Sequence, residues 1–272
     1  MEKTFVLDWD GTFTNNDVRA RNSLEQTILL ISNKYGIGKE KIAKKIRDNK
    51  QDILNCEREY AWFHRGHVAA YCEDPLILNN LVIVQLIQEI NPGHSLSEYW
   101  SETLRFLGES YSKTKAVYVP NSARTLVSLL GLGEVVIVTN SSPEKVSSEL
   151  RNLLEYSETQ SFPENLQLRG YAKKYKIDPT LSEVREECFT RDGRSVNLRR
   201  REYYDILKQF DSSLTYVVGD GYSCDLALPR ELGFHVCLIN DFELMDWARH
   251  EVDSYDKGNN LHLISDFLDV VG

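Results

Sequence analysis

Two aspartates near the start of the chain have the types and spacing that nucleophilic and acid–base chemistry require. Asp8 and Asp10 follow the short apolar run Thr4–Leu7. If this run is a strand, two steps of about 3.3 Å separate the carboxylates, and both start on the same side. One carboxylate can then attack as a nucleophile while the other transfers protons. The alternative is a strand-ending turn, because Asp followed by Gly is also a common turn sequence.

A second acidic pair occurs in a similar position later in the chain. Asp220 and Asp225 come directly after the apolar run Leu214–Gly219. Together with Asp8 and the backbone carbonyl of Asp10, they offer an all-oxygen ligand set, which suits Mg²⁺ better than zinc. The alternative is a glycine-containing loop in which Asp225 only caps the following helix.

A third candidate group stands at the end of another apolar run. Thr139 ends the run Glu134–Thr139, and Asn140 follows it. A hydroxyl at a strand end, close to the first backbone amides of the next helix, is suited to phosphate binding. Thr139 and Asn140 are therefore candidate phosphate ligands. The alternative is that the serines after them only cap that helix.

The candidates share a location because each follows a run of continuous rather than alternating hydrophobicity, which is typical of parallel strands covered on both faces. Helical stretches lie between these runs, and this order predicts an α/β fold with a three-layer, Rossmann-like parallel sheet. Ligands bind at the carboxyl ends of such strands. The predicted strands are Thr4–Leu7, Glu134–Thr139, Leu214–Gly219 and Phe234–Ile239, and the predicted helices between them are Ser142–Leu154, Leu198–Phe210 and Cys224–Leu232.

The segment 15–118 has a different pattern, with helical periodicity almost throughout and no convincing strand. We expect an α/β core domain formed by residues 1–14 and 119–272, and a helical cap domain formed by residues 15–118. Within the cap, Glu57–His67 contains several aromatic and basic side chains. Ligand contacts there are one interpretation, but an amphipathic helix with buried aromatics is favoured.

Residues 156–197 have the least regular pattern. A strand is predicted at Leu166–Ile177 and a hairpin at Glu187–Arg194, where Asp192 and Gly193 form a turn sequence. The basic run Arg199–Arg201 is predicted to lie on a helix surface.

Composition limits the function classes. The 272 residues are 42% hydrophobic and carry a formal net charge of −9, which is ordinary for a globular protein and argues against a nucleic-acid partner. No apolar run approaches the roughly 18 residues of a membrane helix, and the start lacks a signal-peptide pattern. We therefore expect a cytoplasmic protein without a membrane partner. The five cysteines lack paired CxxC spacing and are expected to be reduced. The oligomeric state stays open.

The three motifs together resemble the haloacid dehalogenase superfamily, which has a DxDGT loop, a strand-ending Thr or Ser, a Lys or Arg, and a GDxxxxD loop. The resemblance covers residues 1–14 and about 119–272, and the cap follows the first strand, as is common in this superfamily. It implies that Asp8 forms an aspartyl-phosphate, that Asp10 is the general acid/base, and that Thr139 binds the phosphoryl group. It also implies that Asp220 and Asp225 complete a Mg²⁺ site with the first two aspartates.

The implied activity is a phosphatase that hydrolyses a small phosphorylated metabolite. Dehalogenase members lack an acid at the position of Asp10, because a leaving halide needs no proton, and a phosphoryl substrate is therefore favoured. The alternatives are a phosphomutase or other phosphotransferase of the same superfamily, and a non-catalytic binding protein with this fold.

The basic residue of the superfamily is the least clear match, because no Lys-Pro pair precedes Val217–Asp220. On a strand, Lys174 would share a face with Leu168 and Ala172, so it would point into the site. Lys174 is therefore predicted to neutralise Asp8 and the phosphate. The candidates considered are Lys173, Lys174, Arg194 and Arg199.

Overall fold

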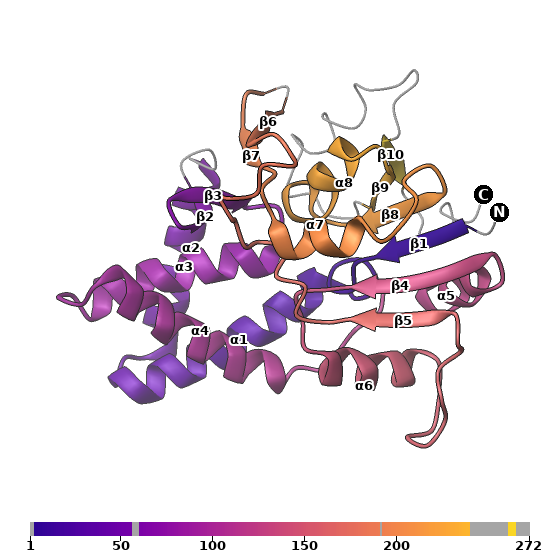
Figure 1. The fold of residues 1–272 in the computed structure, drawn as a ribbon. Coiled ribbons are helices and arrows are strands. Elements are labelled where there is room, and N and C mark those ends of the chain that lie inside the picture. Colours follow the sequence, from indigo (N-terminus) through magenta and orange to yellow (C-terminus); the bar gives the residue numbers. More distant parts are fainter. Residues whose placement is uncertain (1–2, 56–59, 191, 240–260, 265–272) are drawn as a thin grey trace.

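The computed structural model describes residues 3–55, 60–190, 192–239 and 261–264. A six-stranded parallel sheet lies at its centre, in the order β10-β9-β8-β1-β4-β5 (Figure 1). The predicted α/β fold with a parallel sheet is confirmed. The strands are β1 (Lys3–Leu7), β4 (Gly133–Val138), β5 (Leu166–Arg169), β8 (Thr215–Gly219), β9 (His235–Ile239) and β10 (Leu261–Ile264).

The sheet is buried on both faces, which explains the continuous hydrophobicity of its strands. Successive residues of β1 point to opposite faces, so Val6 joins one apolar cluster while Phe5 and Leu7 join another. Helices α5 (Ser122–Leu130) and α6 (Pro143–Leu153) contribute buried side chains to the cluster that contains Phe5 and Leu7.

The other face of the sheet is covered by α7 (Arg201–Leu207), the π-helical turn η1 (Tyr222–Leu226) and α8 (Ala227–Glu231). Both faces thus carry helices, and the arrangement has three layers. Two of these helices are shorter than predicted. Helix α7 starts at Arg201 instead of Leu198, and the turn η1 occupies the first part of the helix predicted at Cys224–Leu232.

The described part of the segment between β1 and α5 contains four helices (Figure 1): α1 (Asn16–Tyr35), α2 (Lys39–Asn55), α3 (Pro75–Ile90) and α4 (Leu96–Ser112). The helical character predicted for this segment is therefore present, and α3 is capped by Asp74. Large buried apolar side chains from all four helices, such as Ile31, Ile42, Leu86 and Phe106, belong to the same apolar cluster as Val6, so these helices pack into one continuous core with a face of the sheet.

The prediction that this segment contains no strand is wrong. Strands β2 (Ala61–His64) and β3 (His67–Tyr71) form an antiparallel hairpin, and the amphipathic helix expected at Glu57–His67 is absent from its described part, 60–67. The two turn residues, Arg65 and Gly66, have φ of 53° and 82°. Two successive positive φ values are those of a type I′ turn, whose twist joins antiparallel strands. The remaining residues of the predicted helix, 57–59, lie outside the described residues.

The strand predicted at Leu166–Ile177 is correct only as far as Arg169. The chain leaves the sheet at Gly170, where an added Cβ would lie 2.7 Å from Pro143, and Tyr171 and Lys173 have φ of 52° and 48°. These left-handed residues turn the chain back over the end of β4 and place Lys174 in a loop.

The predicted hairpin is present, with β6 (Glu187–Phe189) antiparallel to β7 (Ser195–Asn197) and Gly193 in the turn at φ 82°. Its second strand lies just beyond the predicted range. Cys224 and Cys237 form no disulfide with another described residue, and Cys56 lies outside the described residues. No helix among the described residues combines the length and hydrophobicity needed to cross a membrane.

Candidate active site

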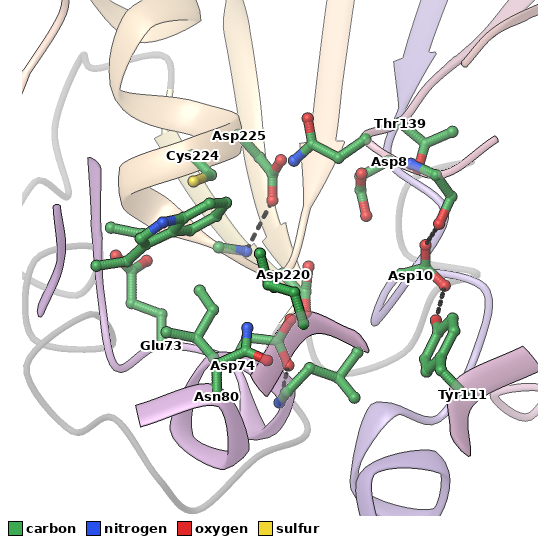
Figure 2. A pocket seen from close by; sticks show the side chains of 18 residues that line it. Asp8, Asp10, Glu73, Asp74, Asn80, Tyr111, Thr139, Asp220, Cys224 and Asp225 are labelled. Carbon is green, nitrogen blue, oxygen red and sulfur yellow. Dashed lines mark hydrogen bonds between the residues drawn. The ribbon is translucent and has the colours of Figure 1, made fainter. Parts of the chain in front are cut away.

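The predicted site residues meet in one pocket at the carboxyl edge of the sheet (Figure 2). Asp8 follows β1, Thr139 follows β4 and Asp220 follows β8. The pocket has a volume of about 430 Å³. Six predicted residues line it: Asp8, Asp10, Thr139, Asn140, Asp220 and Asp225.

The seventh, Lys174, lies buried between two of these acids. Its Nζ is 2.5 Å from Asp8 Oδ1 and 2.5 Å from Asp225 Oδ1. Burial alone would lower the pKa of Lys174, but Asp225 and Asp8 outweigh it and raise this pKa well above its ordinary value. The ammonium group is therefore charged and compensates the buried carboxylates. Lys174 reaches Asp8 from a loop, so strand alternation, on which the prediction rested, is not what places it there.

A buried arginine holds the loop that carries Lys174. The Arg200 guanidinium donates hydrogen bonds to the carbonyl oxygens of Lys174 at 2.5 Å, Ala69 at 2.6 Å and Asn197 at 2.9 Å. Asn140 Oδ1 accepts a hydrogen bond from the Lys174 amide at 2.7 Å. Asn140 therefore positions the loop in addition to lining the pocket.

The prediction that Arg199–Arg201 lies on a helix surface is wrong for Arg200, which is fully buried, because three carbonyl groups need its donors. The other basic candidates have different partners: Arg194 contacts Asp192, Arg199 contacts Glu186, and the Lys173 side chain is exposed.

Three carboxylates can share a cation. Asp8, Asp220 and Asp225 each offer an oxygen atom, and these atoms lie within 4.8 Å of one another. Asp220 Oδ2 is buried and has no hydrogen-bond partner among the described residues. Gly11, at φ 90°, makes room for it, since an added Cβ would lie 1.8 Å from Asp220 Oδ2. The unpartnered oxygen and the all-oxygen donor set fit Mg²⁺.

Electrostatics also favour a cation there. Burial raises the pKa of Asp8 to about 8, and Asp225 adds to this effect while Lys174 opposes it. Burial likewise raises the pKa of Asp220 well above its usual range, with contributions from Asp74 and Asp225. A divalent cation would stabilise the ionised form of both groups, and only ionised Asp8 is a nucleophile.

The environment of Asp10 lowers the pKa of its carboxyl group, whereas that of Asp8 raises it. Asp10 Oδ1 accepts hydrogen bonds from Lys145 and, as Figure 2 shows, from Tyr111, both at 2.7 Å, and its Oδ2 accepts one from Ser141 at 2.5 Å. Burial raises the pKa of Asp10, but Lys145 and the hydrogen bonds outweigh it and lower this pKa below its ordinary value. Without a cation, these environments favour the protonated form of Asp8 and the carboxylate form of Asp10, and a cation bound beside Asp8 would favour its ionised form as well.

Further buried groups fix the surroundings of Asp10. The Arg19 guanidinium lies 3.6 Å from Asp10, 2.7 Å from Glu149 and 4.0 Å from the centre of the Tyr111 ring. Glu149 also accepts a hydrogen bond from Trp9 Nε1 at 2.7 Å. Helices α1, α4 and α6 thus meet at this carboxylate.

Sequence reasoning missed Lys145, Tyr111 and Arg19. Lys145 carried a usable signal, because a cation in the first turn of a helix faces the positive end of the helix dipole and needs an acidic partner. Tyr111 had no such signal, since only folding brings α4 to Asp10.

The remaining polar groups are consistent with phosphate binding. Thr139 is buried, and its hydroxyl oxygen accepts a hydrogen bond from the Ser141 amide at 3.1 Å. Ser142 caps α6, as the capping interpretation predicted, which leaves Thr139 and Ser141 facing the pocket. Cys224 also lines the pocket, but burial raises the pKa of its thiol to about 12, so it is not a nucleophile at neutral pH.

The sequence matches no family model and no curated protein. Solved structures share the fold. YfnB from Bacillus subtilis, described as a candidate HAD-hydrolase bound to magnesium, has 14% identity and a TM-score of 0.52, with 99% of this chain and 96% of that one covered. A candidate β-phosphoglucomutase from Bacteroides vulgatus has 14% identity and a TM-score of 0.50, with 99% and 86% covered.

A 2-haloacid dehalogenase from Pseudomonas syringae is less similar, with 13% identity, a TM-score of 0.47, and 99% and 96% of the two chains covered. At these identities the likeness concerns the fold.

Proposed function

We propose that this chain, which has the fold of the haloacid dehalogenase-like hydrolases, is a Mg²⁺-dependent phosphatase of small phosphorylated metabolites. The observation that carries the proposal is the position of Asp8. On one side its carboxylate contacts the buried ammonium of Lys174, and on the other it faces Asp220, whose Oδ2 has no described partner. A nucleophile between a fixed cation and a set of oxygen ligands for a metal ion is suited to phosphoryl transfer, because both cations would offset the negative charge of the phosphoryl oxygens.

In the first step, a carboxylate oxygen of Asp8 attacks phosphorus, and the bond from phosphorus to the alcohol oxygen breaks. Asp10 gives a proton to the departing oxygen, and an acyl phosphate remains on Asp8. In the second step, Asp10 takes a proton from water, the water oxygen attacks phosphorus, and inorganic phosphate leaves. Asp8 is regenerated, so atoms and charges balance over the cycle.

The other residues of the site bind the phosphoryl group or offset its negative charge. Lys174 offsets the charge of Asp8 and of the phosphoryl oxygens, and the Thr139 hydroxyl can donate to one of those oxygens. Asp8, the Asp10 carbonyl, Asp220 and Asp225 would hold Mg²⁺. When bound, Mg²⁺ supplies further positive charge to the phosphoryl oxygens.

Asp10 supports phosphoryl rather than halide chemistry, because a leaving halide needs no proton. The carboxylate form that Lys145 and Tyr111 favour is the one required of the base in the second step. The acid role in the first step requires a proton on the same group, which Lys145 opposes.

A screen of phosphomonoesters tests the proposal. The purified chain is expected to release phosphate in the presence of Mg²⁺ and to stop when EDTA is added. The Asp8→Asn variant should lose this activity, whereas Asp211→Asn, a change of an exposed aspartate that bonds only within its own turn, should retain it. Unchanged turnover in Asp8→Asn would exclude Asp8 as the nucleophile.

A further inference from the structure

Four large apolar side chains form part of the pocket wall. Leu76 and Ile77 from α3, Leu104 from α4 and Trp62 from β2 line it. The Trp62 ring stacks on Tyr175, with 4.4 Å between ring centroids, so the residue next to Lys174 fixes this wall. Leu104 is 55% exposed, although it is a large apolar side chain. An exposed leucine at the wall of a catalytic pocket is available to contact a ligand.

A second cavity between the helices shares part of its lining with the pocket. This cavity of about 210 Å³ shares Leu76, Asn80, Leu104 and Tyr111 with the pocket and extends to Leu107. No charged side chain among the described residues lines it. Figure 2 shows Asn80 and Tyr111 on the helical side of the pocket, opposite Asp225. A group bound at the carboxylates therefore has an uncharged cavity between α3 and α4 next to it.

The charged groups on the helical side of the pocket are acids. Glu73 accepts hydrogen bonds from the Ser223 amide and hydroxyl, and Asp74 accepts one from the Leu76 amide at 2.7 Å. Their oxygens hold backbone and hydroxyl groups in place, and neither side chain offers a positive charge to an anion. No Lys, Arg or His side chain among the described residues lines the pocket. A second anionic group on the substrate would therefore lose water without gaining a cationic partner.

We propose that the alcohol portion of the substrate is uncharged and carries an apolar chain or ring, which lies against Leu76, Leu104 and Trp62. Bisphosphates and phosphorylated carboxylic acids are then excluded. This inference rests on the proposed phosphatase function, because it assumes that the phosphoryl group lies at Asp8.

Binding of alkylphosphonates tests the inference without any turnover, because their carbon–phosphorus bond resists hydrolysis. Calorimetry on the full chain with Mg²⁺ would compare ethyl-, butyl- and hexylphosphonate with 6-phosphonohexanoic acid. Each buried methylene is expected to tighten binding about fourfold, which corresponds to about 0.8 kcal/mol. The terminal carboxylate should weaken binding by tenfold or more relative to hexylphosphonate.

Equal affinity for the three alkyl chains, or tight binding of the carboxylated compound, would overturn the inference while leaving the phosphatase proposal intact. Failure of every phosphonate to bind, together with no phosphate release in the ester screen, would overturn both.

Two substitutions of Leu104 locate the contact, and its exposure makes them compatible with folding. Leu104→Ala should reduce the advantage of hexyl- over ethylphosphonate and leave ethylphosphonate binding unchanged. Leu104→Lys should reverse the preference, so that 6-phosphonohexanoic acid binds more tightly than hexylphosphonate. The controls are Leu132→Ala and Leu132→Lys, at a leucine that is 45% exposed outside both cavities. If the substitutions of Leu104 and Leu132 had identical effects on phosphonate binding, the assigned contact between the alkyl chain and Leu104 would be contradicted.

Discussion

Glu73 is a buried acid whose replacement should make the protein more stable, and the effect should depend on pH. It lies in the loop between β3 and α3 and is 4% exposed. Burial raises its pKa from 4.5 to about 7, although the hydrogen bonds from Ser223 act in the opposite direction. In Glu73→Gln, the amide oxygen can still accept from the Ser223 backbone, and the group no longer ionises.

The size and sign follow from the difference between the folded and unfolded pKa values. The difference from 4.5 to about 7 is about 2.5 pKa units, and each unit corresponds to about 1.4 kcal/mol. Below pH 4.5 Glu73 is protonated in both states and contributes nothing. Between pH 4.5 and 7 only the unfolded chain loses the proton, so the free energy of unfolding falls as pH rises. Above pH 7 the deficit is constant at about 3 kcal/mol.

Urea denaturation of the metal-free protein measures this effect. Glu73→Gln should match the wild type near pH 4.5 and exceed it by about 3 kcal/mol at pH 8. The control is Glu102→Gln: burial raises the pKa of Glu102, but Lys34 and Tyr35 outweigh it and lower this pKa. The ionised Glu102 therefore adds to the free energy of unfolding at high pH, and this contribution is lost as pH falls. Glu102→Gln should accordingly be less stable than the wild type at pH 8. A pH-independent difference for Glu73→Gln, or a loss of stability at pH 8, would refute the reasoning.

Three further substitutions test the site. Lys174→Met leaves Asp8 in a buried, uncompensated acidic site and should cost about 3–5 kcal/mol of unfolding free energy, measured by denaturation with EDTA present; wild-type stability would contradict the ion pairing. Lys145→Met removes a charged hydrogen bond worth about 1.5–3 kcal/mol and should raise the pKa of Asp10 by about 1–2 units. The pH above which the rate of alkyl phosphate hydrolysis falls should then rise by that amount. For p-nitrophenyl phosphate, whose leaving group needs no proton, this pH should not change. Gly11→Ala places a methyl group against the metal-binding carboxylates and should weaken Mg²⁺ binding at least about tenfold by calorimetry, because the added carbon cannot fit. Unchanged Mg²⁺ affinity would show that the cation binds elsewhere.

The sequence predicted those parts of the site that depend on local pattern. Asp8, Thr139 and Asp220 each follow a run whose hydrophobicity identifies a buried parallel strand, and parallel strands bring their carboxyl ends to one edge. The pocket at that edge therefore followed from strand assignment alone. Lys174 was selected on the assumption of a strand, but Gly170 and two left-handed residues end that strand before it.

The missed features depend on packing between distant segments. Tyr111 reaches Asp10 only because α4 packs beside the sheet edge, and Arg200 is buried because it meets Ala69 from a separate hairpin. The hairpin at Ala61–Tyr71 was missed because its strands are short and the segments around it are helical. Its turn, Arg65 and Gly66, was the available signal.

The central claim is that Asp8 carries the phosphoryl group, and trapping its adduct tests this most directly. With Mg²⁺ and a hydrolysed phosphomonoester, acid quenching followed by mass spectrometry should find one phosphoryl group on the peptide that contains Asp8. Beryllium fluoride, a phosphate mimic, should bind the wild type and not Asp8→Asn. Phosphate release from a chain whose Asp8 peptide stays unmodified, and which does not bind beryllium fluoride, would contradict the account.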